Sequence, residues 1–148
     1  MKSAFSATLI FQIVIFFVVL FTGYICISIN QAKAFNMKNE IVKAIEKYAP
    51  DLENPRFIAH INEALSKEGY RLEGSCSSGY IPYKKTNGIS AGNSGNGEFC
   101  VKIVDIGAHA GIRRRYYKVE TFYQLQIPII QSLFRLKTTG ETKVIYGG

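Results

Sequence analysis

The chain has 148 residues and a formal net charge of +7 at pH 7, from 18 Lys and Arg against 11 Asp and Glu. This length excludes a large multidomain enzyme, because it leaves room for one small domain beyond an N-terminal segment. The positive charge favours anionic partners over cationic ones.

The first predicted element is a membrane-spanning helix over residues 4–29, after a short leader of residues 1–3. No charged residue lies between Ser3 and Ala32, and fifteen of the 21 residues from Leu9 to Ile29 are Leu, Ile, Val or Phe. Together these apolar side chains favour insertion by roughly 5 to 9 kcal/mol. Residues 4–29 would form a helix about 39 Å long, which exceeds the hydrocarbon core of about 30 Å.

The residues after this run allow two interpretations of the N-terminus. Ala32-Lys33-Ala34 has the small-x-small form of a signal-peptidase site, and cleavage after Ala34 would release a soluble secreted domain. A signal peptide usually has an apolar region of about 7–15 residues behind a basic leader, whereas this run is longer and its leader offers only Lys2 and the amino terminus. We therefore favour a retained anchor and keep cleavage as the alternative.

Residues 30–49 are predicted to continue the same helix with an amphipathic pattern. Neither Gly nor Pro occurs between Tyr24 and Ala49, so nothing breaks the helix at the membrane surface, and Pro50 is the first stop signal. We expect one helix of about 45 residues. Its apolar stripe is predicted to consist of Phe35, Ile41, Val42, Ile45, Tyr48 and Ala49.

Residues 50–148 are predicted to form a small α+β domain. A second helix is expected between Asn54, which suits an N-cap, and Gly69, which suits a left-handed exit. After Gly69 the pattern changes to alternation, which predicts short strands over residues 70–73 and 80–83 and a more buried strand over residues 99–106.

The clearest predicted strand covers residues 116–127, where side chains alternate without interruption. One face carries Tyr117, Val119, Thr121, Tyr123, Leu125 and Ile127, and the other carries Tyr116, Lys118, Glu120, Phe122, Gln124 and Gln126. This pattern indicates a half-buried antiparallel strand, which Pro128 ends or places at a sheet edge. Residues 133–139 and 141–146, separated by Gly140, supply a last strand or hairpin. Helices followed by strands predict an antiparallel sheet with the amphipathic helices on one face.

Residues 84–98, KKTNGISAGNSGNGE, are rich in Gly and Asn. The segment lacks the Gly-Lys-Ser/Thr ending of a P-loop and the glycine spacing of a dinucleotide-binding fingerprint. It is predicted to be a flexible hairpin loop, and no cofactor is expected.

Cys76 and Cys100 flank this loop, while Cys26 lies within the apolar run. A Cys76–Cys100 disulfide would close 25 residues and stabilise the fold by about 3.5 kcal/mol. Such a bridge would place the domain outside the cytoplasm, and two unrelated buried thiols are the alternative. The charge rule favours the opposite orientation, because Lys33, Lys38, Lys43 and Lys47 follow the anchor. Long domains translocate largely regardless of such charges, so we favour the extracytoplasmic side.

The sequence shows no nucleophile–base pair, no paired carboxylates in a catalytic setting and no Cys-x-x-Cys, and His60 and His109 have no clustered ligands. We therefore expect no catalytic residues, no metal and no small-molecule substrate. The one concentrated basic patch consists of Arg113, Arg114, Arg115 and Lys118. Such a patch suits DNA phosphates, anionic lipid head groups or an acidic partner, and it also suits a solvated strand that resists edge aggregation.

The anchor, its amphipathic continuation and the C-terminal sheet together resemble the pilin-like architecture. Residues 116–146, YYKVETFYQLQIPIIQSLFRLKTTGETKVIY, resemble the end of small TadE-like and related pseudopilin-like proteins of bacterial tight-adherence pilus loci. In those proteins a tyrosine-rich alternating strand leads into an apolar Pro-containing segment and a final strand that ends near Gly-x-Thr or Gly-x-Ser. The resemblance implies a non-enzymatic, single-pass bacterial membrane protein that acts in a pilus or secretion assembly.

The N-terminus departs from the prepilin pattern. Prepilins carry a small residue at the peptidase site and a Glu five positions into the mature helix, whereas here Ala7 is followed five positions later by Gln12. Gln lacks the charge that would pair with a neighbouring subunit's amino terminus, so a minor or accessory component fits better than a processed major pilin. The candidate residues for helix packing in the membrane are Gln12, Thr22, Gly23 and Ser28.

These observations predict the membrane and other pilin-like or assembly subunits as partners, in a homo- or hetero-oligomer. The alternative function is a membrane-anchored nucleic-acid-binding module in DNA uptake or conjugation, acting through Arg113, Arg114 and Arg115. A secreted enzyme released at Ala34 is a third hypothesis, and no catalytic constellation supports it.

Overall fold

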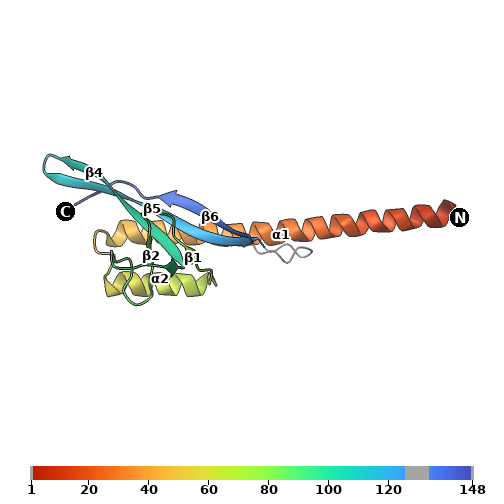
Figure 1. Ribbon diagram of the computed structural model, residues 1–148, viewed down its shortest axis with the longest axis horizontal. Coiled ribbons are helices and arrows are strands. Elements are labelled where there is room, and N and C mark those ends of the chain that lie inside the picture. The colour runs from red at the N-terminus through yellow and green to blue at the C-terminus, as the bar shows by residue number, and fades with distance from the viewer. Residues whose placement is uncertain (1, 126–133, 148) are drawn as a thin grey trace.

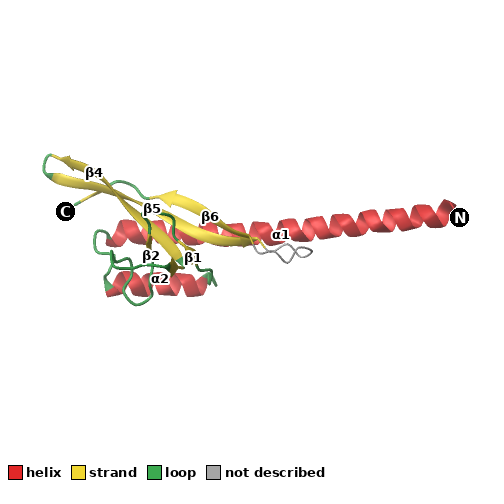
Figure 2. Cartoon of the chain, viewed as in Figure 1, coloured by secondary structure: helices red, strands yellow, loops and turns green. Residues whose placement is uncertain are grey.

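The computed structural model describes residues 2–125 and 134–147, and its helices precede its strands (Figures 1 and 2). The predicted α+β class with a pilin-like layout is confirmed: a long N-terminal helix, a second short helix and then antiparallel sheets. The elements in chain order are α1 (Lys2–Tyr48), α2 (Pro55–Lys67), β1 (Gly74–Ser75), β2 (Ile81–Pro82), β3 (Asn96–Gly97), β4 (Phe99–His109), β5 (Ile112–Leu125), β6 (Phe134–Glu141) and β7 (Ile145–Tyr146).

Helix α1 is a single uninterrupted helix of 47 residues, as the absence of breakers before Pro50 predicts. Its N-terminal half projects away from the rest of the chain, and its C-terminal half lies along the sheet (Figure 1). The buried stripe differs from the predicted one at its start, because Phe35 is 51 % exposed. The side chains that enter the core are Ala34, Met37, Ile41, Ala44 and Ile45.

Helix α2 begins and ends at the expected signals. The Asn54 side-chain oxygen accepts a hydrogen bond from the Arg56 backbone N–H at 2.9 Å, and Pro55 takes the first helical position. Gly69 has a φ of 62°, and this left-handed conformation ends the helix. The Tyr70 N–H then donates to the Leu65 carbonyl at 3.0 Å. The helix runs alongside α1 and buries Phe57, Ile61 and Leu65 (Figure 1).

The main sheet has the strand order β2-β4-β5-β6, and β7 pairs with the N-terminal end of β5. Its helix-facing side buries Val101, Tyr117 and Val119 against α1. Strand β6 also approaches α1 closely, because a Cβ built on Gly140 would lie 2.7 Å from the Lys38 Cδ. The aliphatic part of the Lys38 side chain therefore lies directly against this strand.

The other face of β5 is covered in the middle of the strand, so the prediction of a half-buried strand is wrong there, whereas Tyr116, Lys118 and Gln124 on that face are partly exposed. Glu120 and Phe122 on that face are each only 2 % exposed. The segment around β1 covers them: a Cβ on Gly74 would lie 2.7 Å from the Phe122 ring, and the Ser77 hydroxyl donates to Glu120 at 3.3 Å. Lys137 on β6 pairs with the buried Glu120 carboxylate at 2.9 Å, which satisfies its charge.

The predicted strand over residues 70–73 is also wrong, since the short strand begins at Gly74. Tyr70 instead reaches the sheet through its side chain, where its hydroxyl donates to the Phe122 carbonyl and accepts from the Phe122 N–H, each at 2.7 Å. Strand β4 begins at Phe99, opposite Thr121, so Tyr70 satisfies the β5 backbone where β4 is absent.

The last two strands, β6 and β7, lie along the same edge of β5 and do not pair with each other as a hairpin. Strands β6 and β7 both pair with β5, and the break between them is bridged by Thr142, whose side chain accepts from the Tyr117 N–H at 2.9 Å. Strand β5 lies between β4 and β6, which excludes the predicted edge position along their paired length. Pro128 and the apolar segment of the TadE-like resemblance, residues 126–133, lie outside the described residues.

Candidate functional site

The N-terminal half of α1 is apolar on all sides and exposed. Helix α1 is long and apolar enough to cross a membrane by length and composition, and none of its most apolar 18-residue window is buried in the protein. Large side chains on opposite sides of the helix are exposed alike, with Phe11 at 65 %, Phe16 at 61 % and Phe21 at 64 %. A helix that is hydrophobic all round needs an apolar surrounding, either lipid or other helices.

The four candidate packing residues of this half do not share one face. At about 100° per residue, Gln12 and Gly23 lie within about 20° of each other, whereas Ser28 lies on nearly the opposite side. The face of Gln12 and Gly23 continues along α1 into Asn30 and Ile41, so it is the side that the sheet covers further on. Thr22 lies about 80° from Gln12, and its hydroxyl donates to the Val18 carbonyl at 2.8 Å.

The basic patch lies on a β-ribbon that β4 and β5 extend past the C-terminal end of α1 (Figure 1). A two-residue turn, Ala110 and Gly111, joins the strands, with φ values of 52° and 82°. Alternation divides the patch, because Arg113 and Arg115 face one side of the ribbon and Arg114 and Lys118 face the other. The structure therefore does not bring the predicted basic residues into one surface.

Acidic partners reduce the charge of both sides of this ribbon. Arg115 Nε lies 3.5 Å from Asp105 Oδ2, and Lys118 Nζ lies 3.4 Å from Glu141 Oε1. The Gly107 N–H donates to the Asp105 carboxylate at 2.9 Å, and this bond, followed by the charge of Arg115, lowers the pKa of Asp105. Arg113 is exposed and Arg114 is partly exposed, and within the described residues neither forms an ion pair.

The predicted Cys76–Cys100 disulfide is present. It fastens the β1 segment to β4 on the face of the sheet opposite α1, where Cys100 is fully buried. The bridge therefore holds the cover over Glu120 and Phe122 in place. Cys26, the remaining cysteine, is a free thiol in the apolar half of α1.

Sequence reasoning missed a buried polar cluster beneath the Gly- and Asn-rich loop. Glu98 is 7 % exposed and pairs with Lys85 at 2.8 Å, so this ion pair joins the two ends of the loop. The Tyr83 hydroxyl donates to Asn62 Oδ1 at 2.9 Å, and burial, followed by the Glu98 charge, raises the pKa of Tyr83. The position of Lys85 and Glu98 at the loop ends is the signal that sequence reasoning could have used.

The same loop carries further fixed contacts. Asn93 donates to the Pro82 and Gly88 carbonyls at 3.0 and 2.9 Å, and Ile89 is buried. The predicted flexibility of this loop, residues 84–98, stays a prediction. Among the residues that the structure describes, no three or more His, Cys, Asp or Glu side chains gather where they could hold a metal ion.

A small pocket opens where α1 leaves the sheet, at the end of the domain nearest the exposed half of the helix. It has a volume of about 210 Å³ and is lined by residues from segments that are far apart in the sequence. Asn30 forms one wall and donates from its side chain to the Gln124 carbonyl at 3.1 Å, which fixes the helix to the end of β5. The described lining residues are Asn30, Lys33, Gly69, Tyr70, Arg71, Leu72 and Gln124.

Comparisons with known proteins identify no relative of this chain. No protein-family model, no curated protein and no solved structure matches the chain. The function must therefore be inferred from the two-part helix, the covered sheet, the basic ribbon and the pocket at the base of the domain.

Proposed function

We propose that this protein is a non-enzymatic, single-pass membrane protein that acts as a minor pilin-like or accessory component of a bacterial pilus or secretion assembly. The observation that carries the proposal is the division of α1 into an exposed apolar half and a half packed under an antiparallel sheet. The apolar half would hold the subunit in the membrane and pack on partner helices. The sheet domain would present an assembly surface outside the membrane.

The orientation in this proposal rests on the disulfide. A covalent Cys76–Cys100 bridge suits an oxidising compartment, which supports an extracytoplasmic domain. The lysines behind the anchor favour the opposite orientation, but long domains translocate largely regardless of such charges.

Co-purification of the tagged full chain from detergent-solubilised membranes of the producing bacterium tests the proposal. We expect pilus or secretion components, such as the assembly ATPase, to be recovered with it. Replacing Gln12 and Gly23 by Leu should weaken this recovery, because the two residues share one face and small or polar residues allow close helix packing. Replacing Ser28 by Leu on the opposite side is the matched control. Recovery of the unmodified chain as a lone monomer would overturn the proposal.

The projecting ribbon favours one second candidate function, a membrane-anchored nucleic-acid-binding module. A two-stranded β-ribbon fits the major groove of DNA, and Arg113 and Arg114 are unpaired among the described residues. Replacing Arg113, Arg114 and Arg115 by Ala in the full chain should abolish DNA binding and its dependence on salt. Replacing Lys43, Lys47 and Arg56 by Ala removes the same charge elsewhere and is the control. Absence of salt-sensitive DNA binding by the unmodified chain would exclude this function.

A further inference from the structure

The pocket at the base of the domain lies at the level of lipid head groups if the apolar half of α1 spans a membrane. The apolar run ends at Ile29, and Lys33 is four residues, or about 6 Å, further along the helix. The head-group layer extends roughly 5–7 Å beyond the hydrocarbon core on each side. Side chains on a helix also lean toward its N-terminus, which directs Lys33 back toward the membrane surface.

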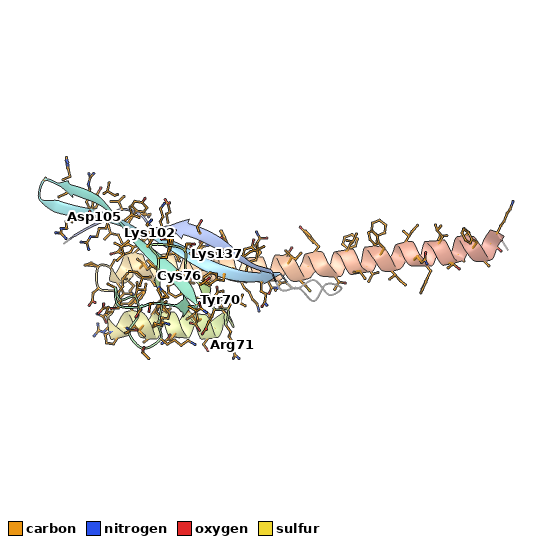
Figure 3. The ribbon with its side chains drawn as sticks, in the orientation of Figure 1. Tyr70, Arg71, Cys76, Lys102, Asp105 and Lys137 are labelled. Carbon is orange, nitrogen blue, oxygen red and sulfur yellow. A yellow bond between two sulfur atoms is a disulfide. The ribbon has the colours of Figure 1, made fainter. Side chains whose placement is uncertain are left out.

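Two cations line this pocket from different parts of the chain. Lys33 comes from α1, and Arg71 comes from the connection between α2 and β1. Figure 3 shows Arg71 at the end of the domain nearest the exposed half of α1. Both side chains are exposed, and within residues 2–125 and 134–147 neither forms an ion pair.

No acidic side chain is among the described residues that line this pocket, although Arg71 also borders a neighbouring pocket that Glu73 and Glu98 line. Glu68 and Glu73 flank the Gly69–Leu72 stretch in sequence, but among the described residues neither lines the pocket. Tyr70 contributes a buried ring whose hydroxyl is fully engaged by the Phe122 backbone, so it does not compete for the ligand. The hydrogen bond from the Asn30 side chain to the Gln124 carbonyl joins two walls of the pocket.

We propose that this pocket binds the phosphate of an anionic phospholipid, with Lys33 and Arg71 holding the phosphate oxygens. The two cations attract the net negative head group, and the apolar surface of α1 beyond Asn30 accommodates the acyl chains. The bound lipid fixes the tilt and rotation of the domain on the membrane, because the phosphate contacts α1 and the α2–β1 connection together. This inference shares with the proposed function only the membrane-spanning helix, and it does not depend on any pilus partner.

Native mass spectrometry of the full chain in a neutral detergent tests the lipid site. The measured quantity is the apparent Kd for the first added phosphatidylglycerol, compared with that for phosphatidylcholine. We expect tighter binding of phosphatidylglycerol, and we expect K33Q/R71Q to weaken it about 25-fold, roughly five-fold for each lost cation. K33R/R71K keeps both charges and should retain the preference. K47Q/R56Q removes two exposed cations from α1 and α2 outside the pocket and should leave binding unchanged.

Three outcomes would overturn the proposal. Equal affinity for the two lipids would show that no site selective for anionic lipids exists. Equal losses of phosphatidylglycerol affinity in K33Q/R71Q and K47Q/R56Q would show that the effect comes from net charge alone. Displacement of phosphatidylglycerol by excess inorganic phosphate would assign the pocket to a soluble phosphate and exclude the lipid. None of these results bears on co-purification with assembly components, so failure here and failure of the proposed function are distinguishable.

Discussion

The two halves of α1 share one continuous backbone and differ in what covers them. In the N-terminal half no residue of the most apolar window is buried by the protein, whereas Met37, Ile41 and Ile45 in the C-terminal half are fully buried. The first half is apolar all round, so any apolar surrounding satisfies it. The second half is apolar on one side, so it requires one particular partner, the sheet. The capacity of the first half to span a membrane therefore depends on composition, and domain folding depends on the position of each residue.

The largest expected effect comes from charges in the first half. Replacing Val14 and Val18 by Arg should cost about 5–7 kcal/mol of insertion free energy, because an arginine at the centre of a membrane helix is unfavourable by roughly 2.5–3.5 kcal/mol. The chain should then become extractable by alkaline carbonate, while the sheet still forms. Replacement of the same two residues by Leu should leave it in the membrane pellet. Retention of the double-Arg chain in the pellet would show that this half is not the anchor.

A matched pair of substitutions tests position dependence. Replacing Ile41 by Ala should destabilise the domain by about 2–5 kcal/mol, because the fully buried side chain leaves a cavity between α1 and the sheet. Replacing Ile15 by Ala should change domain stability by less than about 0.5 kcal/mol, because Ile15 is 47 % exposed and far from the core. Denaturant unfolding in detergent, followed by near-ultraviolet circular dichroism, measures both. Equal losses would contradict the division of the helix.

The disulfide should stabilise the domain and leave the anchor unaffected. Replacing Cys76 and Cys100 by Ser should lower the unfolding free energy by about 3.5 kcal/mol, since the bridge closes 25 residues in the unfolded chain. Cys26 to Ser in the apolar half is the control and should leave domain stability unchanged. Membrane extraction of the double variant should match that of the unmodified chain. A loss of anchoring together with stability would mean that the two halves are coupled.

The features that could be predicted from the sequence are those that depend on local pattern. The length of α1 follows from the absence of a breaker before Pro50, and α2 follows from Asn54 and Gly69 at its ends. The disulfide followed from two cysteines that flank one loop. The division of the basic patch was also predictable, because alternation alone places Arg113 and Arg114 on opposite faces.

The features that could not be predicted are those that depend on distant segments. The alternation of β5 indicates two faces, but it does not show that the segment around Ser77 covers the face of Glu120, which lies 43 residues away. The pocket at the base of the domain likewise needs Asn30 to meet Gln124, 94 residues further along. The hydrophobicity of Phe35 predicts a core position, but the sheet lies on the side of Met37.

The smallest expected effect tests whether a side chain can replace a missing strand. Replacing Tyr70 by Phe keeps the ring and removes the hydroxyl, so the Phe122 N–H and carbonyl lose their partner. We expect a loss of about 1–3 kcal/mol in unfolding free energy, the usual range for buried polar groups left unpaired. Replacing the exposed Tyr146 by Phe is the control and should have little effect.

The same substitution should change how stability depends on pH. Burial raises the pKa of Tyr70 above its ordinary value of 10.0, so the folded protein keeps its proton where the unfolded chain loses it. The contribution of Tyr70 to the unfolding free energy is therefore fully present below about pH 10 and is lost as pH rises above that value. Unfolding free energies measured between pH 8 and pH 11 should fall less steeply above pH 10 in the Phe variant than in the unmodified chain. Parallel curves would show that the Tyr70 hydroxyl is not buried against β5, and that another group holds this end of the strand.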